Sequence, residues 1–246
     1  MPDRLGVPID EIQVCRVAFD DRVPPLSAII DVLDVHERTR LESLHPTRRL
    51  QYAISHLALR DVLGRTIGAS ARRLVIKRWC ARCRQPHGKP YLASPPSQVT
   101  FSLSHSGDFA VIAVAAGRAV GVDIERLDAR VRVDDLARRL LSSRERCALA
   151  GCRGTDVGRR CLEAWSVREA FGKATGRGVP GAMNDPVASS LALDLWEHDR
   201  ERRGARTRWR VDRFEVAPDY SGVVVADRPP WTVTLWDWSW SGDDGG

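Results

Sequence analysis

Apolar side chains recur three or four residues apart in two long stretches of the chain, a spacing that predicts amphipathic helices. The first stretch covers residues 48–63, and arginines lie on its polar face. The second covers residues 159–175 and is followed by Gly176, a residue type that commonly ends helices. A shorter helix, capped by a serine, is predicted to end at Ala150.

Short runs of β-branched and other apolar residues predict strands between these helices. Residues 99–103 and 110–115 are separated by residues 104–108, whose serines, glycine and aspartate are typical of a tight connection, so a β-hairpin is expected. Further strands are predicted at residues 74–79, 119–124, 191–195, 208–214, 221–225 and 231–240. Helices and strands therefore interleave, which predicts an α+β protein.

A turn at residues 116–118 separates two apolar runs near the middle of the chain. The second half then repeats the order of elements of the first: strand, helices, strands. We therefore expect two similar α/β subdomains, residues 1–118 and residues 119–246, each of the size of a small domain.

The composition is that of a folded protein, with 246 residues of which 43% are hydrophobic and 28% charged. No stretch reaches the roughly 18 uncharged apolar residues of a membrane span, and the N-terminus lacks a signal-peptide pattern, so a cytoplasmic protein is expected. Lysine and arginine exceed the acids by 38 to 32, a net charge of +6. The excess favours an anionic partner: nucleic acid, an acidic protein or a phosphorylated small molecule.

The six cysteines are too few to serve as a disulfide framework in so long a chain, so reduced thiols are expected. Cys80 and Cys83 form a Cys-x-x-Cys pair. A zinc site needs two further ligands at comparable spacing, and no second pair follows. The spacing leaves open a zinc site or a turn that carries two reduced thiols, and it favours the turn.

Three tryptophans, Trp236, Trp238 and Trp240, alternate with polar residues and would share one face of a strand. They could form a stacking platform for bases or another ligand. They could equally close the core with a terminal strand, which is the interpretation that we favour.

Two carboxylates, Asp123 and Glu125, alternate with apolar residues, so a strand would point both to the same side. Oxygen ligands of this kind suit Mg²⁺, which takes one or two carboxylates together with water and substrate phosphates. A solvated strand edge is the alternative.

Glu169 and Lys173 lie four residues apart and share a helix face with Trp165. The stripe is either a surface ion pair or part of a site. The Gly-Arg-Gly exit at residues 176–178 beside the same face favours a site.

Basic and small polar residues could complement these acids. Lys89 lies in a proline-braced turn, where it could bind a phosphate or be solvated. Ser104 and His105 are neighbours in the hairpin connection and suggest phosphate binding. A hydrolase pair is rejected because the chain has no Gly-x-Ser-x-Gly elbow there and adjacent residues of a strand face opposite sides.

Five motifs in this order closely resemble those of 4′-phosphopantetheinyl transferases, of the larger monomeric type that activates nonribosomal peptide and polyketide synthases. They are GKPYL at residues 88–92, FSLSHSG at 101–107, VGVDIE at 120–125, RLLSSRE at 139–145 and WSVREAFGK at 165–173. The similarity runs from about Arg40 to Gly178.

The resemblance implies two subdomains related by pseudo-twofold symmetry, with coenzyme A and Mg²⁺ in the cleft between them. It implies transfer of the 4′-phosphopantetheine arm of coenzyme A to a serine of an acyl, peptidyl or aryl carrier protein, with release of adenosine 3′,5′-bisphosphate. By position it assigns the metal to Asp123, Glu125 and Glu169, and coenzyme A to Arg40, Arg48, His56, Lys89, Ser104 and His105.

The expected catalytic residues are Glu169 and Lys173. Glu169 would accept the proton of the carrier serine, and Lys173 would stabilise charge on the leaving bisphosphate. Two positions depart from the family: His56 stands where arginine is usual, and Arg168 where lysine is usual. Because histidine is only partly charged near neutral pH, weaker or pH-sensitive coenzyme A binding is expected.

The positive charge would steer the enzyme toward acidic apo carrier proteins, with exposed arginines and residues 129–150 as the docking face. A monomer that binds neither nucleic acid nor membrane is expected. Two alternatives stay open: a basic module that binds nucleic acid through arginines and tryptophans, and a degenerate homologue that binds coenzyme A without transfer.

Overall fold

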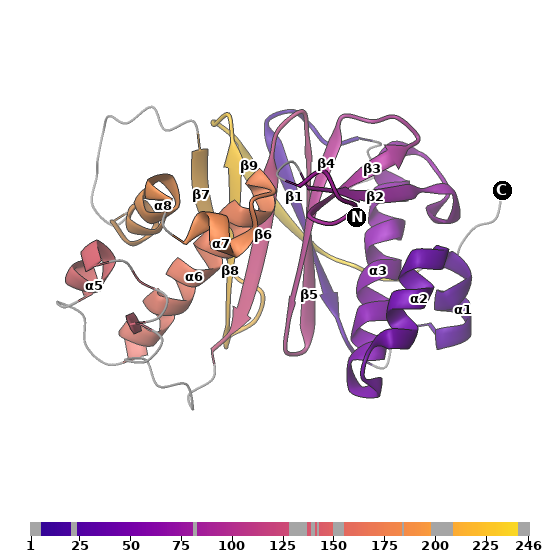
Figure 1. The fold of residues 1–246 in the computed structure, drawn as a ribbon, viewed down its shortest axis with the longest axis horizontal. Coiled ribbons are helices and arrows are strands. Elements are labelled where there is room, and N and C mark those ends of the chain that lie inside the picture. The colour runs from indigo at the N-terminus through magenta and orange to yellow at the C-terminus, as the bar shows by residue number, and fades with distance from the viewer. Residues whose placement is uncertain are drawn as a thin grey trace.

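The computed structural model describes residues 6–20, 24–80, 83–127, 137–138, 141, 143–149, 155–183, 185–197 and 209–240. Two sheets stand side by side in the middle of the molecule, with helices on both outer sides (Figure 1). One sheet has the strand order β4-β5-β1-β9 and the other has the order β6-β8-β7. The mixed α+β class is as predicted, while the pseudo-twofold relation of the two halves stays a prediction.

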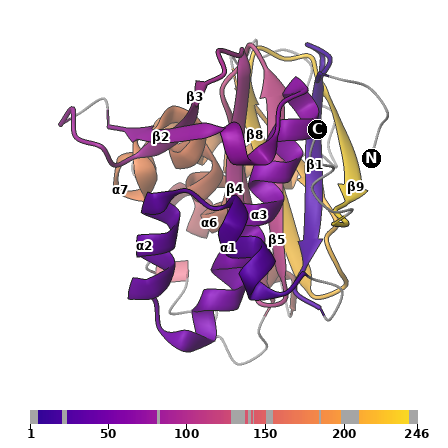
Figure 2. The ribbon, with the colours of Figure 1, turned by 90° about the vertical axis from the view of Figure 1, so that its right-hand side faces the viewer.

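The first half of the chain supplies the larger sheet and the helices on its outer face. Its elements are β1 (Glu11–Ala18), α1 (Leu26–Val32), α2 (Val35–Ser43), α3 (Pro46–Ile67), η1 (Ala71–Arg73), β2 (Val75–Trp79), β3 (Lys89–Ser94), β4 (Val99–Ser106) and β5 (Phe109–Ala116). β2 and β3 form a separate two-stranded sheet, which projects beyond these helices (Figure 2).

The second half supplies the smaller sheet, the helices that cover it, and one strand of the larger sheet. Its elements are β6 (Val120–Arg126), α5 (Ser143–Leu149), α6 (Thr155–Thr175), α7 (Gly178–Ala182), α8 (Pro186–Glu197), β7 (Trp209–Phe214), β8 (Tyr220–Asp227) and β9 (Thr232–Asp237).

Strand alternation divides the core among three layers. In β1, Ile12 and Val14 pack between the two sheets against β6 and β8, whereas Cys15 and Val17 face the helices of the first half. A further cluster lies between β8 and α6 with α8. The result is a helix, sheet, sheet, helix sandwich in which both sheets are buried on two sides.

The last strand leaves the second half and joins the first. β9 pairs in parallel with β1, with Trp236 opposite Cys15. Trp236, Trp238 and Trp240 pack partly buried against the core under α1–α3, and Trp238 Nε1 donates to Asp61 Oδ2 at 2.8 Å. The tryptophans therefore close the core, as favoured from the sequence. The division at residues 118 and 119 stays a prediction, with β9 crossing it.

Three sequence expectations need correction. Residues 191–195 are not a strand but part of α8, because Ala188, Leu191 and Ala192 share a buried face at helical spacing. The hairpin connection is shorter than expected, since β4 continues through Ser106. The long helix α3 extends past the predicted residue 63 and ends at Gly68, whose φ of 69° suits glycine.

The described residues contain no helix long and apolar enough to cross a membrane.

Candidate active site

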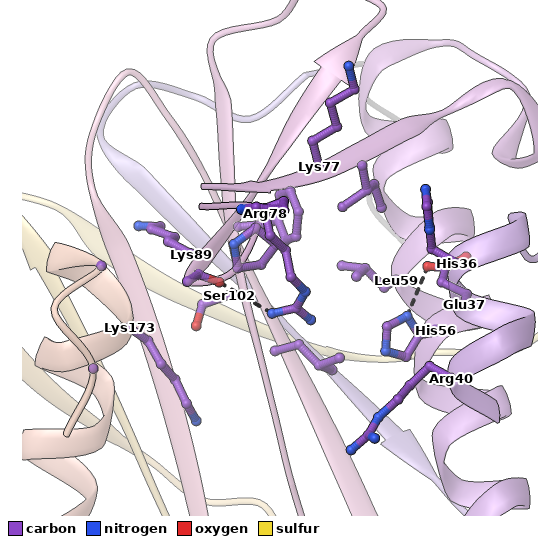
Figure 3. Close-up of a pocket in the computed structure, with 18 of the residues that line it drawn as sticks. His36, Glu37, Arg40, His56, Leu59, Lys77, Arg78, Lys89, Ser102 and Lys173 are labelled. Carbon is purple, nitrogen blue, oxygen red and sulfur yellow. Dashed lines mark hydrogen bonds and ion pairs between the residues drawn. The ribbon is translucent and has the colours of Figure 1, made fainter. Parts of the chain in front are cut away.

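A cavity of about 1020 Å³ lies between α2 and α3, the β2–β3 hairpin, and the end of α6. Basic side chains line it from both halves of the chain; they are Arg40, Lys77, Arg78, Lys89 and Lys173 (Figure 3). The volume and the charge suit a large anionic ligand.

The acids on the helical wall of this cavity are already neutralised. The carboxylate of Glu37 accepts from Arg60 Nε at 2.6 Å, and its other oxygen lies 2.9 Å from His56 Nδ1. Arg60, which is fully buried, also donates to Asp34 at 2.7 Å. Burial raises the pKa of Glu37, but the hydrogen bond and charge of His56 and the charge of Arg60 bring it below its usual value. The wall therefore adds little negative charge.

His56 reaches the cavity with one ring nitrogen committed to Glu37 and with its ring stacked on Tyr52, the centroids 4.1 Å apart. Arg40 on α2 also lines the cavity, and its contact with coenzyme A stays a prediction. Arg48, at the start of α3, is exposed and is absent from the lining.

In the second half of the chain, across the boundary between the two sheets that we call the seam, β6 presents two carboxylates to α6. The strand alternates as predicted: Val122 and Ile124 pack between the sheets, while Asp123 and Glu125 contact side chains of α6. α6 can lie close because residue 121 is glycine, where a Cβ would stand 1.9 Å from the carbonyl oxygen of Ala170.

Asp123 is the buried centre of a cluster of three acids, Asp123, Glu125 and Glu169, which we call the carboxylate group. Its Oδ1 accepts from Ser104 Oγ and from Lys173 Nζ, each at 2.7 Å. Its Oδ2 is buried and has no hydrogen-bond partner among the described residues. An unpaired buried carboxylate oxygen is costly, so this atom is available to a ligand.

The charge of Asp123 affects two further carboxylates, those of Glu125 and Glu169. The oxygens of Glu125 accept from Trp165 Nε1 at 3.1 Å and from Ser106 Oγ at 3.2 Å. Burial, and then the charge of Asp123, raise the pKa of Glu125 and that of Glu169. Three acids that repel one another in this way suit a bound cation. In their present rotamers, no choice of one oxygen from each acid places all three oxygens within 4.8 Å of one another. Among the described residues, only Cys80, Cys83 and His87 bring three ligand atoms that close.

The serines of β4 connect the two halves of the chain. Ser102 Oγ accepts from the Val122 N–H at 3.1 Å, Ser104 binds Asp123, and Ser106 binds Glu125. Ser104 therefore holds Asp123 and is absent from the cavity lining, while the coenzyme A contact expected of it stays a prediction.

His105 lies on the opposite face of β4 and is exposed. Although the residue is exposed, partial loss of water around its ring, followed by the charges of Lys173 and Arg48, lowers the pKa of His105, so this imidazole lies among cations. That environment suits a phosphate contact.

Lys89 lines the cavity with its stem while its ammonium group binds across the seam. Nζ donates to the carbonyl oxygens of Ala174 at 2.8 Å and Val120 at 3.1 Å. Burial lowers the pKa of Lys89 to about 8, although Asp227 opposes the shift. Lys89 thus joins β3 to both β6 and α6.

Sequence reasoning missed Lys77, Arg78 and Tyr52, all of which line the cavity. The sequence offers only a strand pattern at residues 74–79. Lys77 and Arg78 line the cavity because the β2–β3 hairpin lies beside α2 and α3, a placement that no local pattern encodes. Arg168, where the family usually has lysine, is fully buried in an ion pair with Glu145 and takes no part in the cavity.

Comparison with known proteins identifies the class. Residues 119–225, which hold the carboxylate group, match the family model of the 4′-phosphopantetheinyl transferase superfamily. The chain is 27% identical to the 4′-phosphopantetheinyl transferase HetI of a Nostoc species, over 72% of this chain and 74% of the relative. It is 25% identical to a putative 4′-phosphopantetheinyl transferase of a Synechocystis species, over 80% and 76%.

A third relative, the 4′-phosphopantetheinyl transferase psf-1 of Bacillus pumilus, is 37% identical over 58% of this chain and 59% of its own length. These matches agree with the resemblance that the motifs predicted, and they assign residues 119–225 to the 4′-phosphopantetheinyl transferase superfamily. It is a phosphopantetheinyl transferase enzyme.

Proposed function

We propose that this enzyme transfers the 4′-phosphopantetheine arm of coenzyme A to a serine hydroxyl of an apo carrier protein, with Mg²⁺, and releases adenosine 3′,5′-bisphosphate. The observation that carries the proposal is the overlap of two regions. Glu169 and Lys173 line the cation-rich cavity. Lys173 also donates a hydrogen bond to Asp123 of the carboxylate group, and the charge of Asp123 raises the pKa of Glu169 further after burial. A polyanionic donor in the cavity would thus meet the acids at its end.

The cavity offers what the donor requires. Coenzyme A carries a 3′-phosphate and a diphosphate, and Arg40 on α2, Arg78 on β2 and Lys173 on α6 supply positive charge to the cavity from three different elements. Phosphoryl-type transfer depends mainly on charge neutralisation and alignment, so such a setting favours the reaction without a covalent enzyme intermediate.

The three acids fit a divalent cation. Asp123 has a buried oxygen without a hydrogen-bond partner, and burial, followed by the charge of Asp123, raises the pKa of Glu125 and that of Glu169, so a cation would stabilise their charged forms. Asp123, Glu125 and Glu169 would hold Mg²⁺. When bound, the ion would neutralise the diphosphate oxygens of the donor.

Glu169 and Lys173 take the catalytic roles in this proposal. Glu169, which lines the cavity on α6, accepts the proton of the carrier serine. Lys173, held by Ser104 at 2.9 Å and by Asp123, stabilises charge on the departing bisphosphate.

The carrier partner is expected to be acidic. A net charge of +6 would accelerate its encounter with the enzyme, and the effect would fade as salt is raised. The docking segment predicted at residues 129–150 lies largely outside the described residues. We also expect a cytoplasmic monomer.

Intact-mass spectrometry of an apo carrier protein tests the proposal. After incubation with the enzyme, coenzyme A and Mg²⁺, the carrier should gain the mass of phosphopantetheine, and a chelator should prevent the gain. Binding of coenzyme A without any gain would favour the degenerate homologue. Salt-dependent binding of oligonucleotides that Asp123→Ala leaves unchanged, without transfer, would favour the nucleic-acid module.

A further inference from the structure

The loop that joins β2 to β3 brings together three side chains for which the transfer reaction has no use. Cys80 directly follows β2, and Cys83 and His87 lie before β3. One ligand atom from each, two sulfurs and an imidazole nitrogen, lie within 4.8 Å of one another. Cys83 Sγ is 2.7 Å from His87 Nε2. No other group of three histidine, cysteine or acidic side chains in the described ranges is so close.

We propose that Cys80, Cys83 and His87 bind one zinc ion. Thiolate and imidazole are the ligands that zinc prefers, and a tetrahedral ion with Zn–S of about 2.3 Å would hold its ligand atoms roughly 3.5–3.8 Å apart. The observed spacing allows that geometry with small adjustments. Cys83 and His87 are exposed, so water can complete the coordination. Sequence spacing alone missed the third ligand because His87 belongs to no paired motif.

The backbone already holds the loop in a shape that suits a chelate. The Arg84 N–H donates to the Cys80 carbonyl at 2.8 Å, and the Cys80 N–H donates to the Gln85 carbonyl at 3.1 Å. Gly88 has a φ of 95°, and a Cβ there would stand 2.8 Å from the Trp79 carbonyl oxygen, so the chain can return toward Cys80 only with glycine.

The loop also lacks a core of its own. Residues 83–87 are all exposed, so apolar packing contributes little to their order. In small elements of this kind a metal ion commonly replaces the missing core. A zinc ion on Cys80, Cys83 and His87 would join the two ends of the loop.

The position of the loop gives the ion a function, which rests on the proposed use of coenzyme A. Pro86, Gly88 and Lys89 line the cavity, and Arg78 Nη1 donates to the Gly88 carbonyl at 3.3 Å. The ion would therefore fix one wall of the cavity, at the end of the hairpin that projects in Figure 2.

Metal analysis of the purified full chain tests the site without reference to activity. Grown with zinc and kept reduced, the wild type should contain one zinc ion per chain, and Cys83→Ser should fall to background. Cys147→Ser is the matched control, because Cys147 is an exposed thiol on α5, and it should keep its zinc. His87→Cys preserves three ligands and should keep zinc, whereas His87→Asn should lose it.

The proposal is overturned if the wild type holds no more zinc than Cys83→Ser, or if its intact mass is lower by two hydrogens, as a Cys80–Cys83 disulfide would require. Replacement of zinc by cobalt tests the ligands in the folded wild type, so the result does not depend on variants that misfold. Two thiolate ligands should give the cobalt-loaded wild type a strong charge-transfer absorption band, and Cys147→Ser should retain it.

A second measurement tests the role at the cavity. Removal of zinc from the wild type should weaken coenzyme A binding several-fold, and its return should restore the affinity. Unchanged affinity would overturn the bracing role and leave the zinc count intact. Failure of both forms to bind coenzyme A would instead refute the proposed function.

Discussion

Replacement of Ser104 by alanine tests whether β4 positions the carboxylate group. Ser104 Oγ is buried and lies 2.7 Å from Asp123 Oδ1 and 2.9 Å from Lys173 Nζ. Hydrogen bonds to charged groups contribute about 1.5–3 kcal/mol, so Ser104→Ala should lower the free energy of unfolding by roughly that amount. For a chain of this size the melting temperature should fall by about 3–12 °C.

Ser102 provides the matched control. It is also buried, lies on the same face of β4, and accepts from the Val122 N–H at 3.1 Å; among the described residues its hydroxyl makes no hydrogen bond to a charged group. Because Ser102 lines the cavity, the comparison is made on kcat at saturating coenzyme A and not on affinity. Ser102→Ala leaves a buried N–H without its partner and should cost a similar amount, about 1–3 kcal/mol.

The two variants should differ in transfer activity. Ser104→Ala releases Asp123 and Lys173 from a shared contact, and kcat should fall at least about tenfold, equivalent to about 1.4 kcal/mol in the activation free energy. Ser102→Ala should keep the wild-type kcat. Carrier mass followed over time at saturating coenzyme A, with urea unfolding of the same preparations, measures both quantities. Equal kcat values for the two variants at similar stability would refute the positioning role.

Three further predictions concern the framework. Because burial lowers the pKa of Lys89 from 10.5 to about 8, the unfolded chain binds more protons than the folded chain between these pH values. As pH rises through this range, the free energy of unfolding of the wild type should increase by up to about 3 kcal/mol relative to that of Lys89→Met. A difference in urea unfolding that does not change with pH would contradict this. Arg60→Met leaves the buried carboxylate of Glu37 without its arginine partner and should lower the free energy of unfolding by roughly 3–5 kcal/mol, part of which Glu37→Gln recovers. Strictly additive costs in a double-mutant cycle would argue against the network. Gly121→Ala should cost at least about 3 kcal/mol, since its Cβ would meet the Ala170 carbonyl, and wild-type thermal stability would show that α6 can move.

Local patterns predicted the elements that carry the carboxylates. The alternation in β6 placed Asp123 and Glu125 on one side, and the four-residue spacing placed Glu169 and Lys173 on one helix face, as both strand and helix are regular there. The helices and the hairpin followed from the same periodicities.

Long-range pairing accounts for what the sequence did not reveal. Ser104 was expected at coenzyme A, yet it faces Asp123 because β4 lies beside β6, a neighbour relation that no local pattern encodes. Lys77 and Arg78 reach the cavity only through the pairing of β2 with β3, and β9 joins β1 across the whole chain. The apolar run within α8 was misread because a short run fits either helix or strand.

Binding of Mn²⁺, a paramagnetic substitute for Mg²⁺, tests most directly whether the three acids hold a metal ion. Loss of the free-ion signal in electron paramagnetic resonance, with coenzyme A present, should show one ion per wild-type chain. Asp123→Asn should weaken that affinity at least about tenfold, or about 1.4 kcal/mol, while Asp237→Asn, an exposed carboxylate of β9, should not change it. Mn²⁺ affinity that Asp123→Asn leaves at the wild-type value would contradict the account.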